Sequence, residues 1–190
     1  MMRFLFSAGF VLVLCTWANA QMVVSKTDGS SIETPLGFGY AVNKGSTLVR
    51  QVITLNDTLC PLQLDNVTVG TSYLDRKYRF KSNGSIVPKE PLSAYEIHIV
   101  LYNVFGEHLK TLSGTEVVDI SAPMSIENES SWYANENNVS EYFISVAYVA
   151  NVRTQEGQLW RYNYEAIKDK LGELKIAFEE EYLPKSNSED

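Results

Sequence analysis

The chain has 190 residues, of which 45% are hydrophobic and 21% charged, and its formal net charge is −7. These proportions are typical of a globular protein and exclude a collagen, a low-complexity disordered chain and a polytopic membrane protein. The negative charge repels polyanions, and after residue 20 no run of Lys or Arg is longer than a pair. No nucleic-acid partner is therefore expected.

Residues 1–20 have the layout of a secretory signal peptide. An almost unbroken apolar run covers residues 4–15, and Ala18-Asn19-Ala20 is a cleavage site of the small-x-small type. The apolar run has about twelve residues, whereas a membrane-spanning helix needs roughly twenty. The sequence therefore predicts cleavage after Ala20, a secreted or periplasmic protein, and no membrane span once the signal is removed.

Cleavage leaves Cys60 as the single cysteine, so no internal disulfide can form and an apolar core must hold the fold. We interpret Cys60 as a small buried residue; the alternatives are a nucleophile or an intermolecular bridge. A Cys/His zinc site and a Cys-x-x-Cys redox motif are excluded, and no cofactor is expected. An exported chain without disulfides is typical of a bacterial periplasmic or surface protein. Five Asn-x-Ser/Thr acceptors leave glycosylation open.

In chain order, residues 21–45 are polar and glycine-rich, which predicts an arm ahead of the folded domain. From Thr47 onward apolar and polar residues alternate in short stretches ended by turn residues, as half-buried strands require. The stretches lie at 48–55, 62–71, 73–80, 93–103, 109–112, 116–120, 141–153 and 159–162. The segment 87–91 holds two prolines and predicts a crossing between sheets or an edge.

About seven or eight strands at intervals of roughly ten residues, without alternating helices, predict a mainly β fold. We expect an antiparallel immunoglobulin-like β-sandwich over residues 46–163. Residues 93–103 and 109–112 are predicted to form a hairpin around Gly106, and 141–153 a central strand paired with 159–162. Residues 125–140 are rich in Glu, Asn and Ser and predict a long exposed connection.

The spacing of apolar residues changes only once along the chain, from alternation to a helical repeat. After Asn163, which can cap a helix, apolar residues recur at intervals of four, three and four, at Ile167, Leu171, Leu174 and Phe178. This spacing predicts one C-terminal amphipathic helix over 164–183, followed by a flexible tail over 184–190. The apolar stripe either covers the sheet core or binds a partner.

The hairpin sequence from Ile99 to Glu107, Ile-Val-Leu-Tyr-Asn-Val-Phe-Gly-Glu, resembles the strand and turn of bacterial FxLYD-type immunoglobulin-like domains. Leu101, Tyr102 and Gly106 match the pattern, while Ile99 replaces its Phe and Asn103 its Asp. The resemblance covers fewer than ten residues. It implies an exported accessory module without catalytic residues, so no site residue is carried over from the family.

No sequence motif for catalysis or metal binding is found: Gly-x-Ser-x-Gly, a phosphate-binding glycine loop, His-Glu-x-x-His and an Asp-rich calcium loop are all absent. His98 and His108 are interpreted as exposed strand histidines; a metal site built from both would need Glu96 or Glu107 as a third ligand. No catalytic, cofactor or metal residue is assigned.

Exposed aromatic residues are the candidates for ligand binding, because Trp and Tyr supply much contact energy at little entropic cost. Trp132 and Tyr133 lie in the predicted connection, and Trp160 lies near the start of the helix. The alternative interpretation is that Trp160 fills the core and Trp132 anchors its loop.

These observations predict an exported, non-enzymatic β-sandwich module that makes protein or ligand contacts in the bacterial periplasm or at the cell surface. A protein partner is expected, with a glycan or a peptide as the alternative ligand. One alternative is a carbohydrate-binding module or enzyme that uses exposed aromatics near Trp132. Another is a surface assembly subunit that pairs by strand addition.

Overall fold

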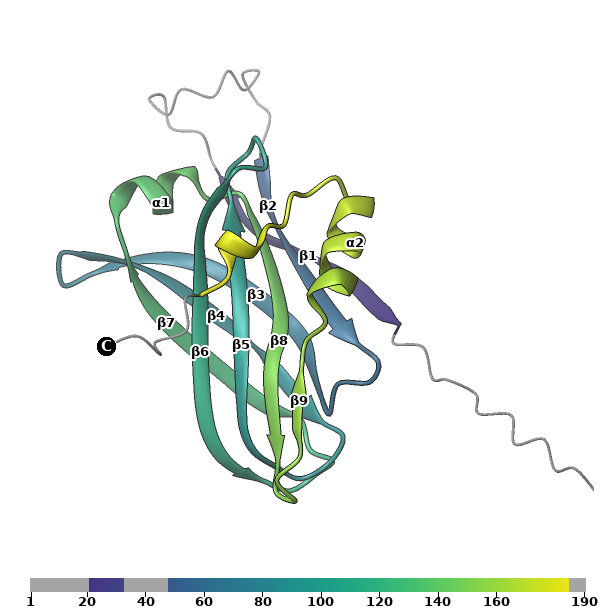
Figure 1. Cartoon of the computed structure of the whole chain (residues 1–190). Helices are drawn as coiled ribbons and strands as arrows, with labels where there is room; N and C mark the ends of the chain where they lie inside the picture. Colours follow the sequence, from purple (N-terminus) through teal and green to yellow (C-terminus); the bar gives the residue numbers. More distant parts are fainter. Residues whose placement is uncertain (1–20, 33–47, 185–190) are drawn as a thin grey trace, which may run out of the picture.

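The computed structural model describes residues 21–32 and 48–184 (Figure 1). The predicted signal peptide, the second part of the predicted arm and most of the predicted tail lie outside the described residues. Within them the strands are β1 (Met22–Ile32), β2 (Leu48–Asp57), β3 (Leu62–Leu74), β4 (Lys77–Pro88), β5 (Leu92–Tyr102), β6 (His108–Ile120), β7 (Ile126–Ala134), β8 (Ile144–Thr154) and β9 (Leu159–Arg161). The helices are α1 (Glu136–Glu141) and α2 (Tyr164–Glu173), and η1 (Glu180–Tyr182) is a 3₁₀ turn.

The strands form two sheets that pack face to face, which confirms the predicted mainly β fold of two layers. Sheet A has the order β1-β2-β8-β5-β6, with β9 also pairing with β8, and sheet B has the order β3-β4-β7. β2 runs parallel to the first part of β8, and β9 runs antiparallel to its last part. The other paired strands are antiparallel.

The core between the sheets is built from alternate residues of facing strands. Its central members are Leu64, Phe80, Ile99, Leu101 and Tyr142. The Phe80 and Tyr142 rings meet edge to face with their centroids 5.6 Å apart, a favoured aromatic geometry. Successive side chains of a strand point to opposite faces of the sheet, so every second residue of these strands points away from this core.

A second core lies on the outer side of sheet A, where α2 and the segment after it cover β5 and β8 (Figure 1). Val100, Tyr102, Val146 and Tyr148 are all at most 1% exposed, so β5 and β8 are buried on both faces. Ile167, Leu171, Ile176 and Phe178 supply the covering side chains. Of the two alternatives for the apolar stripe, the structure therefore shows the first, in which the stripe covers the sheet core.

The helix is shorter than the predicted 164–183. α2 begins after Asn163, whose side-chain oxygen accepts a hydrogen bond from the Ala166 amide, as predicted for an N-cap. It ends at Glu173, where Lys175 adopts a left-handed φ of 61° and the Ile176 amide bonds back to the Leu171 carbonyl. This is a helix C-terminal turn, and beyond it Ile176 and Phe178 reach the sheet from non-helical chain.

Two predicted irregular segments contain regular structure. Part of the predicted arm over 21–45 is β1, which pairs with β2, and the predicted connection over 125–140 contains β7 and most of α1. Both strands lie at sheet edges, where one side of the backbone is unpaired and polar side chains stay exposed, so the apolar pattern is faint. The crossing predicted at 87–91 is confirmed, since β4 of sheet B leads there into β5 of sheet A. The hairpin around Gly106 is also confirmed.

Candidate binding surface

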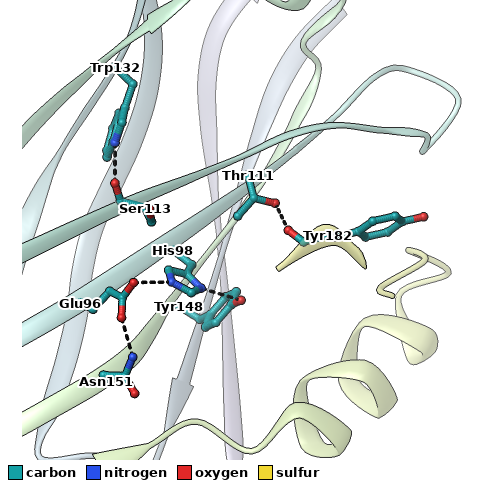
Figure 2. A network of polar contacts seen from close by, with 8 residues as sticks. All are labelled: Glu96, His98, Thr111, Ser113, Trp132, Tyr148, Asn151 and Tyr182. Carbon is teal, nitrogen blue, oxygen red and sulfur yellow. Dashed lines mark hydrogen bonds and ion pairs between the residues drawn. The ribbon is translucent and has the colours of Figure 1, made fainter. Parts of the chain in front are cut away.

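The three aromatic residues selected from the sequence do not share one surface. Trp132 points inward from β7, is half-buried, and its indole Nε1 donates a hydrogen bond to the Ser113 carbonyl of β6 at 2.7 Å (Figure 2). Trp160 is half-buried on β9 and lines a narrow cleft with Cys60 and Leu62. Tyr133 points outward from sheet B and is 60% exposed. Of these three described residues, Tyr133 alone presents an accessible ring to solvent.

Tyr133 is surrounded by basic side chains of the neighbouring strand. Arg79 lies directly opposite it in the β4–β7 register, with its guanidinium carbon 4.8 Å from the ring centroid. The Lys77 ammonium lies 5.0 Å from the same centroid. Cations over an aromatic face are attracted by its negative quadrupole. The ring therefore holds two cations in place and is itself partly occupied by them.

We call the outward side of sheet B the open face. It consists of alternate residues of β4 from Lys77 to Ser85 and of β7 from Glu127 to Tyr133, with the neighbouring outward residues of β3. Figure 1 shows α2 and the following segment on the opposite side of the molecule, over sheet A. The open face is therefore the sheet surface that neither α2 nor the following segment covers.

Basic residues gather at one end of the open face. Lys77, Arg79 and Lys81 alternate with inward residues of β4, so all three point outward. Within the described chain none of them forms an ion pair. Sequence reasoning missed this group because it searched for runs of basic residues. The signal that could have found it is the alternation Lys-x-Arg-x-Lys in a predicted strand, which places three cations on one face.

Polar atoms in the row of Arg79 lack hydrogen-bond partners. Ser72 lies opposite Arg79 on β3, and its Oγ and the Arg79 Nε are buried without a partner in the described chain. Buried polar groups are usually paired, because leaving one unpaired costs free energy. This row of the open face therefore contains hydrogen-bonding atoms that the described chain does not pair.

Side-chain hydrogen bonds join β7 of sheet B to β5 and β6 of sheet A. Asn128 donates to the Tyr95 hydroxyl at 2.7 Å, in addition to the bond from Trp132 to Ser113. Between these bonds lies a cleft lined by Gly84 and Gly114, and a Cβ on Gly84 would come within 3.1 Å of the Val67 Cα. These contacts indicate that Trp132 joins the two sheets from strand β7, whereas the sequence interpretation has it anchor a loop.

His98 is buried and not exposed, contrary to the sequence interpretation. Its Nε2 lies 2.9 Å from Glu96 Oε1 and its Nδ1 lies 3.1 Å from the Tyr148 hydroxyl (Figure 2). Glu96 also accepts a hydrogen bond from Asn151. Burial lowers the pKa of His98, although Glu96 opposes this, and burial raises the pKa of Tyr148 far above its ordinary value. If His98 is neutral, its Nε2 donates a hydrogen bond to Glu96 and its Nδ1 accepts one from the Tyr148 hydroxyl, so all three side chains have hydrogen-bond partners.

This network joins β5 to β8 beneath the aromatic side chains of the second core. The Tyr162 ring packs against His98 and Tyr148, with centroids 6.4 Å and 5.3 Å away. Tyr148 is only 1% exposed. A buried hydroxyl offers no approach for a substrate, so we assign the network to the support of sheet A.

His108 is likewise partly buried, contrary to the sequence interpretation. It stacks on Tyr182 with the ring centroids 4.2 Å apart, and Thr111 donates a hydrogen bond to the Tyr182 carbonyl (Figure 2). Burial lowers the pKa of His108. In the described part of the chain, no group of three His, Cys, Asp or Glu residues is placed to hold a metal ion.

Cys60 is 1% exposed, which confirms its interpretation as a small buried residue. Burial raises the pKa of its thiol to about 12. A thiol of this kind is protonated at neutral pH and is a poor nucleophile.

Comparisons with protein-family models, with curated proteins and with solved structures find no match to this chain. Among the described helices, none has the length and apolar character needed to cross a bilayer.

Proposed function

We propose that this chain is an exported, non-enzymatic module with an immunoglobulin-like sandwich, and that it binds a protein partner through the open face. The sequence supports export through its signal-like residues 1–20.

The strand pairing supports the immunoglobulin-like assignment. β4 pairs with β7 and β5 pairs with β8, so two adjacent strands each pair with the strand three places later. In immunoglobulin domains strand B pairs with E and strand C with F in the same way. β3 and β9 then occupy the places of strands A and G. β1 and β2 are additions to this arrangement. The resemblance to FxLYD-type domains falls in the β5–β6 hairpin, which would hold strand C.

The observation that carries the proposed surface is the contrast between the two outer faces. The chain's own helix and C-terminal segment bury the outer side of sheet A, whereas the open face of sheet B keeps an exposed Tyr133 and cations that form no ion pair with any described residue. Tyr and Arg are enriched among residues that dominate protein interfaces. Because Arg79 and Lys77 already contact the Tyr133 ring, a protein partner fits this face better than a sugar that needs the free ring.

A capture experiment tests the proposal. The mature chain from residue 21 is immobilised beside the variant Arg79→Ser/Tyr133→Ser and a control variant, Lys168→Ser/Glu165→Ser, which changes exposed residues of α2. We expect a periplasmic or surface protein to be retained by the wild type and the control and lost from the open-face variant. Equal retention by all three chains would contradict the proposed surface, as would retention by none of them.

A further inference from the structure

The open face carries opposite charges at its two ends. Arg79 and Lys81 lie at one end, and Glu127 and Glu129 lie at the other. We call residues that are paired across β3, β4 and β7 a row, and these four residues lie in four consecutive outward rows. Arg79 and Glu127, in the outermost of these rows, are separated by six residues along the strand, about 20 Å, which exceeds the screening length of about 8 Å at physiological ionic strength, whereas Lys81 and Glu129 lie in neighbouring rows. Among the described residues no ion pair joins the two ends. Within one copy the outermost charges of the open face are therefore not paired with each other.

We propose that a second copy of this chain occupies the open face in a two-fold symmetric, face-to-face dimer. The inference rests on the proposed function in using the same surface, and it gives that surface a second occupant beside the captured protein. Isologous two-fold dimers are the commonest protein assemblies, and they require a patch that is complementary to itself. A face with one basic and one acidic end meets this requirement when the two copies run in opposite directions.

The position of the two-fold axis, which the proposal places so that opposite charges meet, determines which rows face each other. A two-fold axis in the interface, perpendicular to the strands at the level of Ser82, sets β4 against β4 and β7 against β7 with the directions reversed. The row of Arg79 then faces the row of Ser85 in the second copy. That row contains Asp65 on one side and Glu127 on the other, and both are exposed. Each Arg79 is thus placed between two carboxylates.

The next row inward repeats the pattern. Lys81 faces the row of Asn83 in the second copy, which contains Glu129. Both pairs of rows occur twice by symmetry, so four basic residues meet six carboxylates across the interface. The rows of Arg79 and Lys81 also contain three small residues, Gly70, Ser72 and Ser131, beside the large Tyr133, and these small residues leave room for the side chains of a second sheet.

The size of the face sets the strength of the dimer. A sheet of three strands with nine residues each measures about 14 Å by 30 Å. Its flat area is roughly 400 Å² for each copy, without the additional surface of the side chains. This is about half of the roughly 800 Å² that a standard specific interface buries on each partner, so it falls in the size range of weak and transient contacts. We therefore expect a weak and reversible dimer that weakens as salt screens its charge pairs.

Sedimentation analysis of the mature chain over a range of concentrations at low and high salt tests the dimer. The wild type should associate at low salt and dissociate at high salt. The variants Arg79→Glu/Lys81→Glu and Glu127→Lys/Glu129→Lys should each remain monomeric alone, and their equimolar mixture should restore the dimer. Lys26→Glu/Lys168→Glu makes the same change of charge elsewhere on the surface and should associate like the wild type.

Restored association of the mixture cannot result from misfolding of either variant, so it separates the interface from loss of structure. A wild-type chain that is monomeric at every concentration in low salt overturns the dimer. Association that both charge-reversal variants retain also overturns it, because pairing through a strand edge does not depend on these charges. Neither result decides the proposed function, which depends on capture of a different protein by the open face.

Discussion

Nδ1 of His98 lies 3.1 Å from the hydroxyl of Tyr148, on neighbouring strands β5 and β8. The other ring nitrogen of His98 bonds to Glu96, so the imidazole is held at both ends. Only a neutral ring can accept the proton of the tyrosine hydroxyl and donate to the carboxylate at once. The pair therefore links the stability of sheet A to the protonation of a single buried histidine.

Acidification should destabilise the fold through His98. Burial lowers the pKa of His98 in the folded state, so the unfolded chain binds the proton more readily. The stabilising contribution is complete above the unfolded value of about 6.5 and is lost as pH falls from there through the folded pKa. His108 has a lowered pKa as well and adds in the same direction.

Urea denaturation between about pH 5 and pH 7.5 measures this effect, with a slope of at most about 1.4 kcal/mol per pH unit for each histidine. The groups that face His98 are Glu96, Tyr148 and Tyr162. His98→Gln should flatten the slope and leave only the part due to His108. A variant with the wild-type slope would show that His98 does not titrate differently on folding.

Removing the hydroxyl of Tyr148 should be costly although the ring stays. Tyr148→Phe leaves Nδ1 of buried His98 without its donor, which costs about 1–3 kcal/mol. Because the neutral form loses a hydrogen bond, the pKa of His98 should also rise, as followed by the imidazole proton shifts in NMR. Tyr162→Phe is the control, since Tyr162 meets His98 through its ring. An equal loss in both variants would contradict a specific role for the Tyr148 hydroxyl.

Most of the strands could be predicted from the sequence because the alternation of apolar residues is strong wherever one face is buried. The hairpin around Gly106 and the crossing at 87–91 follow from such patterns. β1 and β7 could not be found in this way. Each lies at a sheet edge, and β7 alternates between half-buried and exposed residues, so its polar side chains conceal the period. The order of the strands depends on long-range pairing, which a local pattern does not contain.

The site residues show the same limit. Tyr133 could be selected by residue type, but its partner Arg79 lies 54 positions away in the chain and is brought beside it by the β4–β7 pairing. His98 was interpreted as exposed because its strand was expected to bury one face only. The burial of the second face depends on α2 and on Phe178, which approach from the end of the chain.

The segment after α2 should behave as part of the core. Phe178 is 2% exposed and packs against the rings of Tyr148 and Tyr164. Phe178→Ala should lower the free energy of unfolding by about 3–5 kcal/mol, the usual cost of emptying a buried aromatic site. Glu180→Ala, which changes an exposed residue of the same segment, should leave the urea midpoint nearly unchanged. A loss below about 1 kcal/mol for Phe178→Ala would mean that the segment covers the sheet only loosely.

Cys60 should resist alkylation as long as the protein is folded. Burial raises the pKa of its thiol from 9.0 to about 12, and each pKa unit lowers the thiolate fraction about tenfold, so reaction at neutral pH should slow by roughly a thousandfold before access is considered. Iodoacetamide labelling followed by mass spectrometry measures the rate, and the mature chain in urea is the control because its one thiol then reacts freely. Rapid stoichiometric labelling of the folded chain would show that Cys60 is accessible, which would return the nucleophile interpretation to consideration.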